Sequence, residues 1–202
     1  MGTEGEQPFA IPAKAKGVSR QHAEVTIHDD GRWTLRDLDS TNGTFIRDKD
    51  GQLRPVGKKT IDPMTFISLG PDNSKGCSFY ARQLLNPGNF LAEYEFLNAK
   101  EDEYEAEVEK IERNTRIIKW LIFAINVLIV VFSFAIESQM SLWILRSGTV
   151  LSTFFTAVYD ANGIKKRCKE RYERFRQCPN PQCSHRLNTE EIRDMQCRKC
   201  KK

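Results

Sequence analysis

The chain has 202 residues, enough for one ordinary domain and some smaller pieces, and its formal charge of +4 is modest. Most of that charge follows Asn162, and so small an excess does not by itself argue for nucleic-acid binding. Apolar residues concentrate between Ile117 and Tyr159, which a soluble single domain would not require. Residues 1–16 lack the apolar core of a cleavable signal peptide, so we expect the N-terminal part to stay in the cytoplasm.

Short β-like runs are predicted throughout residues 1–85, where apolar and polar residues alternate between turns rich in Gly, Pro, Asn and Asp. One of these turns, Asp48 to Gly51, ends in the Asp-Gly pair of a hairpin tip. The predicted strands cover residues 23–27, 33–36, 65–69 and 78–81. This pattern indicates a mainly β domain without helices, a sandwich or a barrel.

Two polar loops flank the first two of these runs. Gly17 to Ala23 has the sequence GVSRQHA, and Ser40 to Phe45 has the sequence STNGTF. A phosphate group requires several donors that converge from rigid loops, and hydroxyls, an amide and a guanidinium supply them here. The candidate ligand-binding residues are Ser19, Arg20, Thr41 and Asn42. The two loops therefore indicate a phosphate-binding surface and not a catalytic one.

The pair S-R-x-H-A and S-T-N-G-T resembles the signature of the forkhead-associated (FHA) domain, a phosphothreonine-binding β-sandwich. The resemblance implies that the hydroxyls of Ser19 and Thr41 contact phosphothreonine and that Asn42 holds the main chain of the bound peptide. Arg20 is then a secondary contact. The bound partner would be a phosphorylated protein.

His22 and Gly43 are expected to shape the loops. A ring nitrogen of His22 is placed to bridge the two loops, and in the FHA family the matching histidine is mainly structural. Gly43 permits a positive φ before the next strand starts.

The chain departs from the FHA pattern at Gly2-Thr3. FHA domains usually carry Gly-Arg upstream of the serine, and that arginine is their principal phosphate clamp. Thr3 stands in its place here, and the resemblance covers only the later part of the domain, through about Leu85. We therefore expect either a start upstream of Met1 or a shortened relative with weakened phosphate binding.

Residues 90–116 are acidic and rich in helix-forming side chains. Apolar residues recur at an a/d-like spacing, although Glu101 occupies one of these positions. The segment is either a solvated helical stalk or a short dimerising coiled coil. The second alternative would make the protein a homo-oligomer.

Two apolar runs follow, at residues 117–136 and 142–159. Twenty helical residues reach about 30 Å, the thickness of a bilayer core. Lys and Arg flank the pair on its outer sides, most densely in residues 164–177, whereas the connecting loop has none. The positive-inside rule then gives a two-helix transmembrane hairpin with both termini cytoplasmic, which favours a bacterial inner membrane. The alternative is that the second run, interrupted by Arg146, lies in the membrane interface.

The tail, residues 178–202, has two close pairs of cysteines: Cys178, Cys183, Cys197 and Cys200. Tetrahedral Zn²⁺ requires four soft ligands, and a cytoplasmic location disfavours disulfides. The arrangement resembles a zinc ribbon, so we expect structural zinc that supplies folding energy to the tail. The alternatives are a redox-active or disordered tail, and a site in which His185 replaces Cys183.

Taken together, the sequence indicates a membrane-anchored adaptor whose FHA-like head binds phosphothreonine-containing partners. The alternative is an assembly module of a membrane complex that binds without phosphate. A nucleic-acid-binding ribbon is a third interpretation, but membrane topology and anionic lipid explain the basic segment without it. We do not expect an enzyme, because the chain has no nucleotide-binding loop, nucleophile elbow or recognisable pair of carboxylates.

Overall fold

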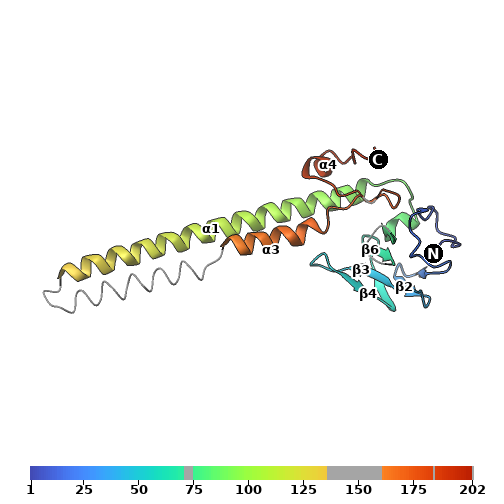
Figure 1. Cartoon of the computed structure of the whole chain (residues 1–202), viewed down its shortest axis with the longest axis horizontal. Helices are drawn as coiled ribbons and strands as arrows, with labels where there is room; N and C mark the ends of the chain where they lie inside the picture. Colours follow the sequence, from blue (N-terminus) through green and yellow to red (C-terminus); the bar gives the residue numbers. More distant parts are fainter. Residues whose placement is uncertain (71–74, 136–160, 184, 202) are drawn as a thin grey trace. The chain divides into compact units, whose positions relative to one another are not determined.

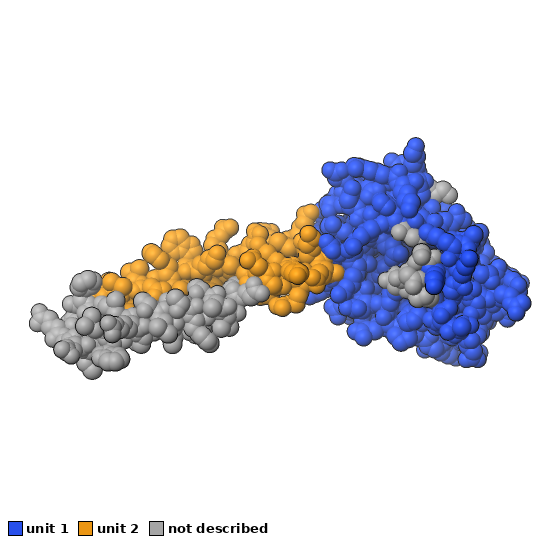
Figure 2. Space-filling model, viewed as in Figure 1, with its two compact units in different colours: residues 1–102, 171–202 blue, residues 103–170 orange. Residues whose placement is uncertain are grey.

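The computed structural model describes residues 1–70, 75–135, 161–183 and 185–201. The chain forms two compact units, one made of residues 1–102 and 171–202 and the other of residues 103–170 (Figure 2). The first unit contains the β domain and the four cysteines. The second contains most of a long helix and the start of the helix that follows it.

The N-terminal domain is a β-sandwich of two antiparallel sheets, as the strand pattern predicts (Figure 1). One sheet has the order β1-β2-β5 and the other has the order β4-β3-β6-β7. The strands are β1 (Ala23–Ile27), β2 (Trp33–Asp37), β3 (Thr44–Arg47), β4 (Leu53–Pro55), β5 (Lys58–Ile61), β6 (Phe66–Leu69) and β7 (Cys77–Tyr80).

Alternating side chains of the two sheets fill the space between them. Leu35 of β2 lies opposite Val25 of β1, while Ile46 of β3 lies opposite Ile67 of β6. Leu35 and Ile67 are fully buried, as expected for residues that point into a sandwich core. The burial of these apolar side chains is the main source of the domain's stability.

The turn from Asp48 to Gly51 is the hairpin tip that its sequence predicts. It joins β3 to β4, Gly51 has a φ of +72°, and the Asp48 N–H donates to the Gln52 carbonyl at 2.8 Å. Beyond β4, residues Val56 and Gly57 carry the chain to the opposite sheet, where β5 pairs with β2.

The outer face of the four-stranded sheet is also covered. Every residue of β6 is buried, and its Phe66 contacts Tyr80, which in turn packs edge-to-face against Phe96 of the following helix. The chain reaches that helix through a 3₁₀ turn, η1 (Ala81–Leu84), so the prediction of no helix in residues 1–85 is wrong at this turn. Gln83 of this turn donates a hydrogen bond at 2.5 Å to the buried carboxylate of Glu93, in the first turn of the helix. The helix therefore starts against the sandwich and not on a loose linker.

One helix, α1 (Leu91–Ala135), runs without a break through the predicted stalk and the first predicted span. No Gly or Pro falls within these 45 residues, so nothing in the sequence interrupts it. Its later part exposes large apolar side chains, among them Trp120, Phe123 and Leu128. Among the described residues, this is the one helix long and apolar enough to cross a membrane. The second predicted span, 142–159, lies outside the described residues.

The described residues after α1 contain two further helices, α3 (Ala161–Glu173) and the short α4 (Thr189–Arg193). Within the second unit, the Lys165 ammonium lies 2.8 Å from the Glu112 carboxylate, which ties the start of α3 to α1. Lys165 accordingly holds the pKa of Glu112 below its usual value.

Candidate functional site

The two polar loops lie next to each other at one end of the sandwich. The first leads into β1, and the second carries the chain from β2 of one sheet to β3 of the other. Arg20, Thr41 and Asn42 are exposed, and Ser19 is half-buried. The polar side chains singled out from the sequence thus share one accessible surface.

His22 is fully buried between the two loops. Its Nδ1 accepts a hydrogen bond from the Ser19 N–H at 3.0 Å, so Nδ1 carries no proton and Nε2 does. Nε2 then donates to the Gly43 carbonyl of the second loop, also at 3.0 Å. Burial lowers the pKa of His22, and the contact with Gly43 offsets only part of that effect. A neutral imidazole therefore fixes the distance between the loops.

Two more hydrogen bonds join the loops near the surface. The Thr41 N–H donates to the Ser19 hydroxyl at 3.3 Å, and the Asn42 side-chain amide donates to the Gly17 carbonyl at 2.9 Å. Each bond uses only part of the hydrogen-bonding capacity of these side chains. The Ser19 hydroxyl and the Asn42 amide are consequently held in place while they keep hydrogen-bonding capacity for a ligand.

Asp37, which sequence reasoning missed, organises the second loop. Its carboxylate accepts hydrogen bonds from the Ser40 N–H at 3.0 Å, the Ser40 hydroxyl at 2.7 Å and the Thr44 hydroxyl at 2.5 Å. Burial raises the pKa of Asp37, but the hydrogen bonds from Thr44 and Ser40 outweigh it and hold the pKa below its usual value. The available signal was an aspartate three residues before a serine, which is a common local turn.

Thr3 lies beside the first loop, because its N–H donates to the Ser19 carbonyl at 3.1 Å. The neighbouring Gly2 has a φ of +151°, and a Cβ there would lie 2.1 Å from the Arg20 carbonyl oxygen. Only glycine fits such a close approach of two backbones. The chain therefore places Thr3 next to the backbone of Ser19.

Gly70 and Lys75, which lie in the chain between β6 and β7, form hydrogen bonds with the two loops. The Gly70 N–H at the end of β6 donates to the Gly43 carbonyl at 2.9 Å, and the Gly17 N–H donates to the Lys75 carbonyl at 2.7 Å. Gly70 has a φ of +79°, and a Cβ there would approach the Gly17 carbonyl to 2.9 Å. Neither Gly70 nor Lys75 was singled out from the sequence, since their role depends on contacts between distant segments.

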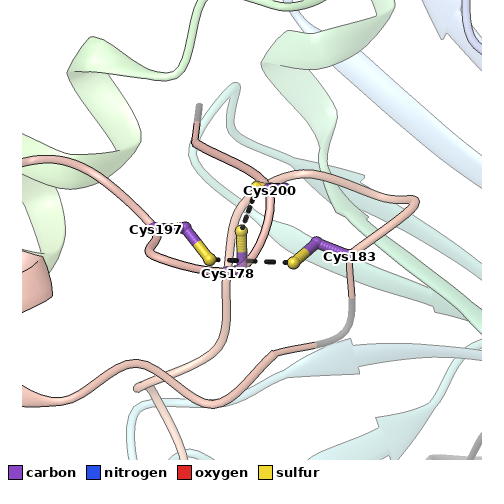
Figure 3. A group of neighbouring side chains, drawn as sticks. All are labelled: Cys178, Cys183, Cys197 and Cys200. Carbon is purple, nitrogen blue, oxygen red and sulfur yellow. Dashed lines mark hydrogen bonds between the residues drawn. The ribbon is translucent and has the colours of Figure 1, made fainter.

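The four cysteines of the tail converge on one point (Figure 3). The sulfurs of Cys178 and Cys200 are 3.7 Å apart, as are those of Cys183 and Cys197, and all four lie within 4.8 Å of one another. These distances exclude disulfides, whose sulfurs lie about 2.05 Å apart.

The cysteine cluster has the dimensions of a metal site. Four sulfurs at about 2.3 Å from a tetrahedral zinc lie about 3.8 Å from one another, close to the separation of 3.7 Å found for two of the pairs. Burial raises the pKa of Cys183 to about 11, so the buried thiols would ionise only beside a compensating cation. The residues present fit a structural Zn²⁺.

Glu191 connects the two cysteine pairs to α4. Its carboxylate accepts from the Asn188 N–H at 2.9 Å and the Arg198 N–H at 2.8 Å, which caps α4 and holds the loop between Cys197 and Cys200. Burial raises the pKa of Glu191, but those hydrogen bonds from Asn188 and Arg198 hold it below its usual value. His185 lies 3.3 Å from the same carboxylate and belongs to a second group with Glu191 and Cys197. The Cys₄ set includes Cys183, so His185 is not needed to complete it.

The cysteine tail packs against the start of α1. Cys178, Cys183 and Cys197 share a core with Tyr94 and Leu97 of that helix. The pKa of Tyr94 is raised, first by burial and then by the neighbouring cysteines. The tail therefore completes its apolar core with residues from another part of the chain.

Comparison with known proteins finds one matching family, for the N-terminal part of the chain. Residues 1–67 match the family model of the FHA domain, and no curated protein matches the chain. FHA domains are in general protein-interaction modules that bind phosphothreonine. The match contains both polar loops and ends within β6, while the structure continues the same sheet through β7.

Proposed function

We propose that this protein is a membrane-anchored adaptor whose FHA-like head binds phosphothreonine-containing protein partners. The arrangement of the two loops carries the proposal. Inside the region matched by the FHA model, His22 joins two loops that expose Arg20, Thr41 and Asn42 beside the Ser19 hydroxyl. A phosphate dianion would accept hydrogen bonds from the hydroxyls and Arg20, and Asn42 would hold the peptide backbone.

The membrane part of the proposal is supported by α1 and α3. The long run of exposed apolar side chains in α1 starts at Ile117, five residues after Glu112, and Lys165 of α3 contacts Glu112. The chain thus leaves and returns on the same side of the apolar stretch. That geometry favours a hairpin whose two flanks, and with them the head and the tail, share the cytoplasmic side.

In this account the cysteine tail is a structural element. Cys178, Cys183, Cys197 and Cys200 would hold Zn²⁺, and the bound ion would stabilise the tail against α1. We assign no catalytic step to the protein.

The binding assignment is tested by Ser19→Ala and Asn42→Ala in the full chain. Each change removes a hydrogen bond to a charged or tightly held ligand and should weaken phosphopeptide binding by about 1–3 kcal/mol. Thr60→Ala, on the exposed face of β5, is the matched control and should bind as the wild type. Unchanged affinity in both loop variants would refute the site.

One observation favours a second function, a phosphate-independent assembly module. Thr3 sits beside Ser19 at 3.1 Å, where FHA domains usually have their phosphate-clamping arginine. Under this function, treating the partner with phosphatase would leave the complex intact.

A further inference from the structure

A cavity of about 480 Å³ lies between the hairpin of β3 and β4 and the segment that leads from α3 into the first cysteine pair. Both sides belong to the first compact unit, and they lie side by side in Figure 1. Its volume falls within the range of about 300–1,000 Å³ that is typical of small-molecule sites. The cavity is separate from the polar loops, which contribute none of its lining residues.

The lining of this cavity is strongly basic. It contains four arginines and a single carboxylate, that of Glu173. Arg176 is paired with Glu101, which lies outside the lining, by two hydrogen bonds of 2.7 Å each. After these two carboxylates are counted, the cavity keeps a formal excess of two positive charges.

The guanidinium groups reach the cavity from different elements. Arg47 comes from β3, where its guanidinium stacks 3.6 Å from the ring centroid of Phe66 and donates to Gln177 at 2.8 Å. Arg174 directly follows α3, and Arg186 comes from the tail. Stacking on an aromatic face holds a guanidinium in position.

Two of these arginines keep donors for a ligand. Arg174 donates to the Asp50 backbone carbonyl at 3.3 Å and, through both terminal nitrogens, to the side-chain oxygen of Gln52, which leaves its Nε–H for a ligand; it makes no ion pair within the described part of the chain. Arg186 uses a single nitrogen, Nη2, to bind Glu173 at 3.0 Å. A guanidinium has five N–H donors, so most of those on Arg186 remain for a further acceptor.

We propose that this cavity binds a phosphate group carried by a small molecule. Arg47, Arg174 and Arg186 converge from separate directions. A tetrahedral phosphate offers several terminal oxygens to such a set, whereas a planar carboxylate offers two. The excess positive charge matches the charge of a phosphate dianion. This site does not depend on phosphothreonine recognition by the loops.

The test is calorimetric titration of the zinc-loaded full chain in detergent with inorganic pyrophosphate at constant ionic strength. We expect saturable binding that Arg174→Gln and Arg186→Gln each weaken by about 10-fold, as is usual for the loss of a charge-assisted contact. Arg32→Gln is the control, since Arg32 is an exposed arginine of the same unit that pairs with Asp30. Bound zinc and the circular dichroism spectrum report whether each variant folds.

Several results would overturn the proposal. These are no binding of pyrophosphate by the wild type, equal weakening by the Arg32 control, or unchanged affinity in both cavity variants. Equally tight binding of succinate would contradict the assignment to phosphate. Loss of pyrophosphate binding in Ser19→Ala would show that the anion binds at the polar loops and not in the cavity.

Discussion

Glu101 of α1 accepts two hydrogen bonds from the guanidinium of Arg176, each 2.7 Å long. Only 5% of the Glu101 side chain and 20% of the Arg176 side chain are exposed, so the pair is largely removed from water. It joins the early turns of α1 to the segment that enters the first cysteine pair, two residues before Cys178. This pair therefore ties the start of the helix to the tail within the first unit.

Glu101→Gln should therefore loosen the tail. The variant leaves the guanidinium of Arg176 without a compensating charge in a mostly buried place, which typically costs about 3 kcal/mol. Amide hydrogen exchange of residues 178–200 in the full chain measures the effect. Asp102→Asn is the matched control, because Asp102 pairs with Arg193 on the exposed side of the same turn and should cost less than about 1 kcal/mol. Equal exchange in the two variants would contradict the role given to Glu101.

Each chain should bind one zinc ion through the four cysteines. Cys183→Ser removes a ligand and should lose most of the metal, which elemental analysis of the purified protein measures. His185→Asn should keep the metal, because the four sulfurs converge without His185. The reverse pattern would show that His185 is a ligand and Cys183 is not.

Removal of the metal should also affect α1. Tyr94 and Leu97 share a core with the cysteines, so a chelator should raise hydrogen exchange in the first turns of the helix. Exchange at β1, which lies outside this core, is the internal reference. An unaltered helix after complete zinc loss would mean that the tail does not stabilise it.

Thr3→Arg should strengthen phosphopeptide binding. The backbone of Thr3 lies 3.1 Å from that of Ser19, so an arginine there would start beside the loop hydroxyls. A bidentate guanidinium contact with phosphate should improve affinity by about 10-fold or more. Thr60→Arg adds the same charge on β5 and separates a local contact from long-range attraction. A gain of the same size in both variants would refute a specific contact at residue 3.

His22 predicts how the stability of the head depends on pH. Its pKa is lowered in the folded state, so below about 6.5 the unfolded chain takes up a proton that the native one resists. The contribution of His22 to stability should be constant above that pH and fall as the pH drops through it, by at most about 1.4 kcal/mol per pH unit. Urea unfolding followed by Trp33 fluorescence, with Trp120 and Trp143 replaced by Phe, measures this.

The control for that measurement is His28. It is exposed and contacts Thr34 across the strand pair at 3.0 Å, so His28→Asn should keep the pH dependence. His22→Gln should remove the dependence whatever its effect on stability at pH 7. A pH dependence that persists in His22→Gln would assign it to another group.

Much of the head could be predicted because its signals are local. Alternation placed strands at 23–27 and 33–36, and the Asp-Gly pair placed a hairpin tip before Gln52. The order of strands could not be read in the same way. Only two residues separate β4 from β5, which usually indicates a hairpin, yet these strands join different sheets.

Contacts between segments far apart in the chain were the main feature that the sequence did not predict. The cysteine spacing indicated a metal site, but nothing local indicates that Arg47 would contact Gln177, 130 residues later. The tail appeared too short for an apolar core, and it completes one with Tyr94 and Leu97. Asp37 was missed for a similar reason, because its partner Thr44 belongs to the next strand.

The most direct test of the account compares one degenerate peptide library in two forms, with threonine phosphorylated and with the same threonine unmodified. Both are titrated against the zinc-loaded full chain in detergent. The account predicts selective binding of the phosphorylated form, lost in the double variant Ser19→Ala, Asn42→Ala and retained in Thr60→Ala. Equal binding of the two forms, or no binding by a folded head, would contradict phosphothreonine recognition and leave the assembly module as the better account.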